Sequence, residues 1–508
     1  MRSIIQILSA AAAISVNGFA ADLTSARIHV TVEERSTPGE PLPCLVFWRD
    51  AAGKSLRAEG LPFWRDHFAS TGKFTLDLPA GRYSYEIERG PEYSKTTGQL
   101  AVAAGAPEQR LTVTLDRIVD LQKLGWWPGD LHVHRPIDEI ELLMRAEELY
   151  VAPVITWWNN RNLWAARTVP ARRTVQFDRN RFYEVLGGED ERGGGALLYF
   201  HLDTPLQIGA AAREFPPMLR FLKEARTQPA AWIDIEKPFW WDVPVWLALG
   251  QADSIGLLNN HVWRDGMLDN EAWGHARDKS KFPSPLGNGY WSQEIYYQIL
   301  NCGFRIPPSA GSASGVLPNP AGYNRVYVEA GPQLEPSVWW RNLKRGRSFV
   351  SNGPLLLARA NDQLPGVVFQ LAAGKPLSME IAGDLISRDP IDRIELIRDG
   401  KIERTIRQPG GRFNFGKVEF ARGGWFLVRV IGEDTKTFRF ASTGPFYVEE
   451  PTQQPVISRA SVQFFIDWVR ERAEGVRLPD ATQQAELLAD LRAAERFWME
   501  RLAKANRD

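Results

Sequence analysis

The chain has 508 residues, 44% of them hydrophobic and 24% charged, which is ordinary for a globular protein of about three domains. Its 61 basic and 61 acidic residues cancel, so neither a basic nucleic-acid-binding protein nor an acidic disordered chain is expected. Histidine is scarce, with 7 residues, whereas tryptophan is abundant, with 19. Most of both lie between Trp126 and Trp340, so this middle stretch is where chemistry is expected.

Residues 1–20 resemble an export signal. Arg2 gives a short basic start, the stretch from Ile4 to Val16 is mostly apolar, and Gly18 and Ala20 suit a cleavage site after Ala20. No later apolar run reaches the roughly 18 residues that a membrane-spanning helix needs. The sequence therefore predicts a soluble protein that is periplasmic or secreted and has no membrane span.

Residues 21–120 carry the pattern of a small β-sandwich. Alternating runs such as RIHVTV and LTVTL accompany short apolar strands and a Pro-Ala-Gly turn. Nothing in this part indicates catalysis. Export permits disulfides, but Cys44 lies here and Cys302 lies far along the chain, so the two are expected to stay unpaired.

Residues 121–347 alternate strand-like runs, such as GDLHVH, VAPVIT and AWIDIE, with helical stretches. This alternation favours an α/β fold with a parallel sheet or a closed barrel. In such barrels, function is carried by residues at the carboxyl ends of the strands. The candidate residues of this chain fall at or just after such strand ends.

Residues 348–450 predict a second small β-sandwich, with a hairpin turn at Asp399-Gly400 between two alternating runs. Residues 456–508 have apolar residues at helical spacing, interrupted at Gly475 and Pro479, with Asp480 as an N-cap. A C-terminal helical hairpin that packs on the body of the protein is expected. A dimerisation arm is the alternative, and the oligomeric state stays open.

The sharpest chemical feature is His132-Val133-His134. On an extended strand, residues two apart point to the same face, so both imidazoles can reach one cation. Imidazole suits zinc, manganese or iron, and a divalent metal is the expected cofactor. The alternative is a pair of ordinary polar residues at a strand end.

The segment WWPGDLHVHR resembles the first motif of the PHP (polymerase and histidinol phosphatase) superfamily of metal-dependent phosphoesterases. The downstream runs IDIEKPFWWDVP, NCGFRIPPSAGSASGVLPNPAGYNRVYV and GRSFVSNGPLL resemble its carbaryl-hydrolase-like branch. The resemblance covers about residues 121–450. It implies a distorted seven-stranded TIM-like barrel, two or three metal ions, and a metal-bound hydroxide that attacks a phosphoester or a carbamate-type ester.

The resemblance assigns metal ligands residue by residue. The two histidines of the first motif match His132 and His134, and the metal-bridging carboxylate matches Glu189 in VLGGEDE. The histidine that follows in the family matches His201, although Ala196 fits that position equally well.

The sequence departs from the family pattern at three places. A family T-D-H motif is replaced by Thr156-Trp157-Trp158, and a His-Pro pair by Lys237-Pro238. The final G-x-D-x-H motif reads Gly-Ser-Ala-Ser-Gly at residues 311–315. Ligands that the family keeps are therefore missing, and the expected metal site is reduced.

Four further residues are candidates for the chemistry: Glu236, Lys237, His261 and Arg325. Glu236 could be a ligand or a general base, or could form a salt bridge. Lys237 would stand where a second cation sits in the family, and it or Arg325 could steady an oxyanion. His261 follows a strand end, which suits either a functional or a capping residue.

Two functions follow. The favoured one is an exported metal-dependent hydrolase of ester-type bonds that acts on a small-molecule or carbohydrate-derived substrate. The alternative is a degenerate barrel that only binds a carbohydrate or another small ligand. Paired tryptophans such as Trp157-Trp158 and Trp240-Trp241 could line a pocket or pack in the core. No nucleotide-binding glycine loop is present, so no nucleotide cofactor is expected.

Overall fold

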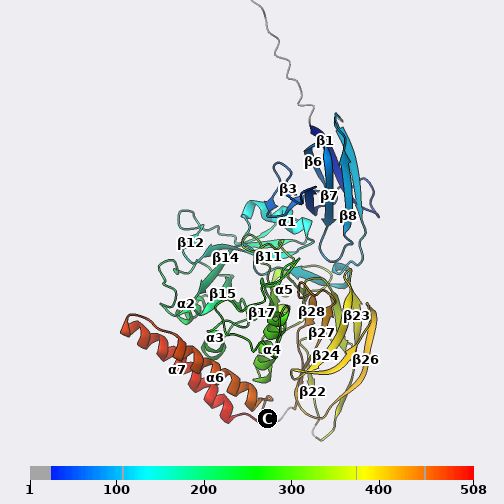
Figure 1. Ribbon diagram of the computed structural model, residues 1–508. Coiled ribbons are helices and arrows are strands. Elements are labelled where there is room, and N and C mark those ends of the chain that lie inside the picture. The colour runs from blue at the N-terminus through cyan, green and yellow to red at the C-terminus, as the bar shows by residue number, and fades with distance from the viewer. Residues whose placement is uncertain (1–24, 106–107, 373, 451–453) are drawn as a thin grey trace, which may run out of the picture.

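The computed structural model describes residues 25–105, 108–372, 374–450 and 454–508 (Figure 1). The export signal expected at residues 1–20 lies outside these residues. Among the helices of the described ranges, none is both long and apolar enough to cross a membrane. Cys44 and Cys302 are both buried and are not bonded to each other.

The N-terminal part consists of two β-sheets around one core (Figure 1, blue). Its strands are β1 (Ser25–Glu34), β2 (Cys44–Asp50), β3 (Ser55–Leu56), β4 (Phe63–Trp64), β5 (His67–Ser70), β6 (Lys73–Pro79), β7 (Gly81–Glu88), β8 (Thr96–Val102) and β9 (Glu108–Leu115). One sheet has the order β6-β1-β9, and the other has the order β4-β5-β2-β7-β8 with β3 beside β2. Alternating residues bury Val30, Trp48 and Phe68 between them, since successive side chains of a strand face opposite sides.

The middle part mixes strands with short helices. Its elements are η1 (Gln122–Leu124), β10 (Trp126–Gly129), η2 (Ile137–Glu139), α1 (Ile140–Ala146), β11 (Val151–Trp158), β12 (Arg161–Asn162), β13 (Thr174–Gln176), β14 (Phe182–Arg192), β15 (Gly195–Phe200), α2 (Met218–Ala225), β16 (Trp232–Ile235), α3 (Val243–Leu249), β17 (Ser254–Leu258), α4 (Gly287–Asn301), β18 (Pro308–Ala310), β19 (Arg325–Glu329) and α5 (Pro336–Lys344). β11 pairs with β14 in parallel, as do β16 with β17 and β17 with β18. The pairs β14–β15, β15–β16 and β10–β19 are antiparallel.

The prediction of a distorted seven-stranded (β/α) barrel is wrong. Strands make up 38% of the structure and helices 19%, and the described residues form no closed barrel. The middle strands instead belong to a 17-stranded sheet that continues into the C-terminal part. One physical reason for the difference is the tight turn between Arg192 and Gly195, which pair with each other. Gly195 has a φ of 129°, which favours glycine, and the turn makes β14 and β15 a hairpin where a β/α barrel needs a crossover helix.

The C-terminal part extends the large sheet and adds a small one. Its strands are β20 (Ser348–Ser351), β21 (Leu355–Ala360), β22 (Val368–Gln370), β23 (Leu377–Ile386), β24 (Ile391–Arg398), β25 (Lys401–Ile406), β26 (Gly411–Phe420), β27 (Gly424–Gly432), β28 (Phe440–Thr443) and β29 (Phe446–Glu449). β19 and β20 pair antiparallel, which joins this part to the middle one within a single sheet. β21, β23 and β26 form a separate three-stranded sheet.

Two helices form the C-terminal tail, α6 (Arg459–Gly475) and α7 (Ala481–Ala503). Asp480 caps α7 by accepting the backbone N–H groups of Thr482 and Gln483, as expected of an N-cap. The tail packs on the middle part: the indole N–H of Trp498 donates to the carbonyl of Pro244 at 3.0 Å. The helical hairpin therefore lies against the body of the protein (Figure 1, orange and red).

Buried ion pairs fix the N-terminal part to the rest of the molecule. Arg89 pairs with Glu148 of the middle part, and Glu88 accepts from Arg264 at 3.1 Å and from Arg388 at 2.7 Å. Arg264 belongs to the middle part and Arg388 to the C-terminal part, so Glu88 ties all three parts together. Removing one partner of such a pair leaves a buried charge uncompensated, which is strongly destabilising.

Candidate metal centre

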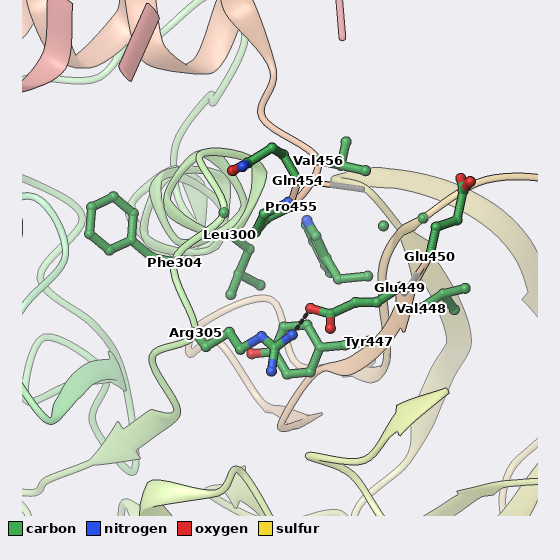
Figure 2. A pocket seen from close by; sticks show the side chains of 14 residues that line it. Leu300, Phe304, Arg305, Tyr447, Val448, Glu449, Glu450, Gln454, Pro455 and Val456 are labelled. Atoms are coloured by element: carbon green, nitrogen blue, oxygen red, sulfur yellow. Dashed lines mark ion pairs between the residues drawn. The ribbon is translucent and has the colours of Figure 1, made fainter. Parts of the chain in front are cut away.

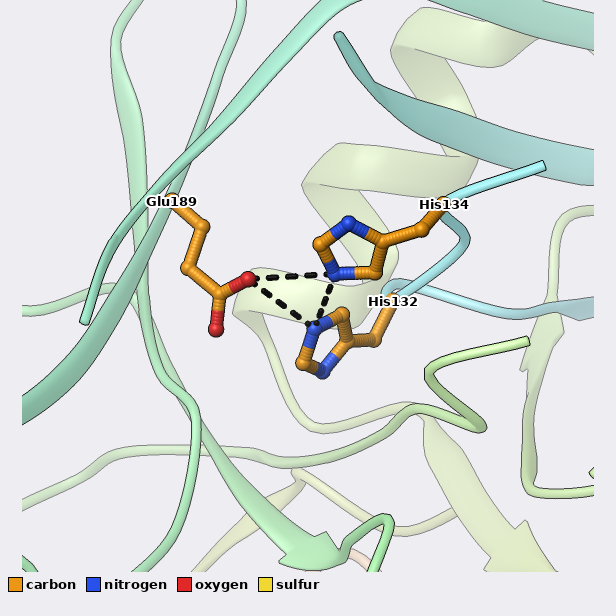
Figure 3. A group of neighbouring side chains, drawn as sticks. All are labelled: His132, His134 and Glu189. Atoms are coloured by element: carbon orange, nitrogen blue, oxygen red, sulfur yellow. Dashed lines mark hydrogen bonds and ion pairs between the residues drawn. The ribbon is translucent and has the colours of Figure 1, made fainter. Parts of the chain in front are cut away.

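Three side chains from two segments converge in the interior: His132, His134 and Glu189 (Figure 3). The two Nε2 atoms lie 2.9 Å apart, and Oε2 of Glu189 lies 3.4 Å from Nε2 of His132 and 3.1 Å from Nε2 of His134. Ligand atoms around a tetrahedral metal ion lie about 3.3 Å apart when the bonds are 2.0–2.1 Å long. Oε2 of Glu189 is buried and has no hydrogen-bond donor among the described residues. The three atoms are therefore spaced as ligands of one cation would be.

The histidines lie on an extended segment between two others. Leu131 N–H donates to the carbonyl of Ala310 at 3.0 Å, and His134 N–H donates to the carbonyl of Ser314 at 2.7 Å. On the other side, Ile155 N–H donates to the carbonyl of Val133 at 2.8 Å. This pairing keeps the segment extended, so both imidazoles point to one face.

Asp130 holds this segment in place. Its buried carboxylate accepts the backbone N–H groups of His132 at 3.0 Å, Ser312 at 3.0 Å and Gly322 at 2.6 Å. Burial raises the pKa of Asp130, although these hydrogen bonds oppose the shift. Close approach also needs Gly311, because a Cβ there would clash with the Cβ of His132 and lie 3.2 Å from its backbone nitrogen.

Glu189 owes its place to the two glycines before it. A Cβ at Gly187 would lie 2.6 Å from the carbonyl oxygen of Val154, and one at Gly188 would overlap the indole of Trp157. Glycine at both positions therefore lets β11 and β14 lie against each other, with Trp158 paired to Glu189 in parallel register. Trp157 is buried in the core, whereas the Trp158 ring lies beside His134, 5.0 Å away between ring centroids.

Glu236 and Lys237 join the group from the end of β16. Oε1 of Glu236 lies 3.4 Å from Nδ1 of His132. Its other oxygen pairs with the ammonium of Lys237 and accepts the indole N–H of Trp240 at 2.9 Å. Burial alone would lower the pKa of His132, but the charges of Glu189 and Glu236 outweigh it and raise that pKa to about 10. The same contacts hold the pKa of both carboxyls below the ordinary value despite their burial.

His261 is buried nearby as a neutral imidazole. Its Nδ1–H donates to the carbonyl of Asn270 at 2.9 Å, so Nε2 is the unprotonated nitrogen. Burial and the charge of Lys237 lower the pKa of His261 to about 3. This side chain therefore stays uncharged near neutral pH and offers a free lone pair.

No family model and no curated protein matches the chain. Among solved structures, the chain is similar to the CARDB domain of PF1109 from Pyrococcus furiosus, at 10% identity to its solution NMR structure and at 12% identity to its crystal structure in complex with di-metal ions. Each match covers 19% of this chain and 96% of that domain, with a TM-score of 0.14. A likeness this weak carries no argument about this chain.

Two of the predicted site residues are not brought to the group. His201 follows β15, which runs antiparallel to β14, so it lies at the opposite end of the hairpin from Glu189. There it pairs with Glu184 at 2.9 Å and packs against Trp340. Arg325 is buried in an ion pair with Glu147 at 2.6 Å, so a structural contact occupies its guanidinium.

The sequence assigns no role to two further residues of the site, Asp130 and Glu191. Asp130 precedes the histidine motif, but two of its three backbone partners, Ser312 and Gly322, come from a distant segment that the sequence does not reveal. Glu191 lies two positions after Glu189 on the same strand and so faces the same side. Burial and the charge of Glu189 raise the pKa of Glu191 to about 7, while Lys237 opposes the shift. This alternation was the one signal that could have identified Glu191.

A separate hollow lies where α4 ends against β27 and β29 (Figure 2). Phe304, Trp425 and Tyr447 contribute to its lining, and Arg305 and Glu449 form an ion pair within it. None of its lining residues belongs to the histidine–glutamate group. The hollow and the candidate metal centre are thus two different places in the molecule.

Proposed function

We propose that this chain is a metal-dependent hydrolase of ester-type bonds, phosphoester or carboxyl and carbamate ester, in which His132, His134 and Glu189 hold a divalent cation. The observation that carries the proposal is the convergence of their three ligand atoms, with a buried carboxylate oxygen that lacks a donor. Two imidazoles and a carboxylate suit zinc, manganese or iron. Such a cation supplies Lewis-acid activation of water and of an ester oxygen.

The surrounding side chains have distinct parts in this proposal. Glu236 lies 3.4 Å from Nδ1 of His132, so its charge faces that side of the ring and Nε2 is left free to bind. His261 offers its unprotonated Nε2 as a proton acceptor. Trp158, beside His134, gives the centre an apolar wall on which a sugar face or an aromatic ester could stack.

The likeness of WWPGDLHVHR to the first PHP motif supports the same class of reaction. The closed barrel of that superfamily is not part of the proposal. The second candidate function is a protein that binds a carbohydrate or another small ligand without catalysis. Trp158, Lys237 and the 311–315 stretch favour it, since they stand at positions where the superfamily keeps metal ligands.

Metal analysis of the purified chain tests the proposal. The wild type is expected to retain or take up a divalent cation, and the double variant His132→Ala/His134→Ala is expected to lose it. His29→Ala is the matched control, because His29 lies on β1 of the N-terminal part. Chromogenic phosphate, carboxylate and carbamate esters then separate the hydrolase from the binding protein. A wild type that takes up no metal after reconstitution would contradict the proposal.

A further inference from the structure

Lys237 is a buried cation beside the candidate metal centre, to which it is linked through Glu236. Its side chain is 3% exposed, and its ammonium pairs with Glu236 and lies 4.5 Å from the centroid of the Trp240 ring. Lysine is almost never fully buried unless it is paired, because removing its charge from water is costly. The contacts with Glu236 and Trp240 therefore stabilise this positive charge in the interior.

Several carboxyl groups lie around Lys237, more than one ammonium can pair with. Glu189, Glu191 and Glu236 approach the same interior from β14 and from the end of β16. Neither Oε2 of Glu189 nor Oε1 of Glu236 has a hydrogen-bond donor among the described residues. Among the described residues, one group of side chains brings its ligand atoms close enough together to hold a cation, namely His132, His134 and Glu189, so the geometry provides one cation position beside these carboxyl groups.

The contacts of Glu236 place Lys237 next to the candidate ligands. One oxygen of Glu236 faces His132, and the other faces Lys237. Glu236 therefore links the ammonium to the ring of His132, at the nitrogen that faces away from the metal position. His261 is also buried in these surroundings, where its Nδ1–H donates to the carbonyl of Asn270.

We propose that Lys237 is the second positive charge of this centre, so that the site takes one divalent cation and the ammonium faces the negative charge that develops on an ester substrate. This inference rests on the proposed function. An ammonium held in a dry interior stabilises such charge without reorganisation. The consequence is a metal stoichiometry of one.

Zinc titration of the full chain by calorimetry, with elemental analysis of the dialysed protein, tests the inference. The wild type is expected to bind one zinc ion per chain. Lys237→Gln is expected to take up a second ion or to bind the first at least about tenfold more tightly, since it removes a like charge that is linked to His132 through Glu236. Lys237→Arg keeps the charge and is expected to stay at one ion. Lys123→Gln is the surface control, because Lys123 is 80% exposed.

The outcomes separate the two proposals. Two zinc ions in the wild type overturn the inference and leave the proposed function standing. No zinc in the wild type overturns the proposed function and the inference with it. Unchanged stoichiometry and affinity in a folded Lys237→Gln variant also overturn the inference. If that variant does not fold, the wild-type stoichiometry still decides.

Discussion

Replacement of Asp130 by asparagine tests how the histidine segment is held. The carboxylate accepts three backbone N–H groups at 2.6–3.0 Å, whereas an amide has one oxygen, so at least one N–H must face the amide NH₂. A hydrogen bond to a charged group is worth about 1.5–3 kcal/mol, and an unpaired buried donor costs about 1–3 kcal/mol. Asp130→Asn is therefore expected to lower the free energy of unfolding by about 2–4 kcal/mol.

Urea unfolding followed by tryptophan fluorescence measures this change. Asp77→Asn is the control, because Asp77 pairs with Arg27 on the surface and such pairs are worth at most about 1 kcal/mol. Zinc affinity gives an independent readout, with a loss of about 10- to 100-fold expected when a group that orients a ligand is removed. A variant with the urea midpoint and the zinc affinity of the wild type would refute the role assigned to Asp130.

Three further predictions follow from the structure. Gly311→Ala is expected to lower the melting temperature and to weaken zinc binding, because its Cβ would clash with the first histidine, whereas Gly209→Ala meets only ordinary contacts and should change neither. Burial raises the pKa of Glu92 to about 8 from its ordinary 4.5, so the folded state holds that proton more tightly than the unfolded chain does. The free energy of unfolding of the wild type should therefore fall relative to that of Glu92→Gln as the pH rises from about 4.5 to 8, by at most about 1.4 kcal/mol per pH unit. The same difference in melting temperature between the two proteins at pH 5 and at pH 8 would contradict this prediction. Cys44 and Cys302 are buried and unbonded, and burial raises the pKa of both thiols. Ellman's reagent should therefore label neither thiol in the native chain and both in denaturant. Rapid labelling of the native chain would contradict this prediction.

Part of the candidate centre could be predicted because it is local in sequence. His132 and His134 are two apart on an extended segment, and this alone puts both rings on one face. Glu189 is predicted only by the resemblance to the PHP superfamily, because residue spacing gives no reason to choose it over its neighbours. The place of His201 depends on the direction of β15, which the residue pattern does not encode. Burial and strand periodicity are local properties, whereas strand direction is set by turns and long-range pairing.

The same distinction explains the fold. The C-terminal helices follow from apolar spacing and from Asp480, which caps α7. Apolar strand runs are also visible in the sequence, but the same runs suit a parallel barrel and a mixed open sheet. The turn at Gly195 decides between them, because it reverses the chain after β14 without a crossover helix. The direction of β15 is therefore set by a short run of glycines, residues 193–195, and not by the broader alternation of strands and helices.

The pairing of β19 with β20 determines where the chain can be truncated for expression of its parts. A cut near Arg347 falls inside one sheet, so each fragment would expose a row of unpaired backbone N–H and C=O groups along a former interior strand. Exposed edge strands of this kind pair readily with other chains, so fragments that end there should aggregate. The middle and C-terminal parts are best expressed together, and their unfolding should be measured as one event.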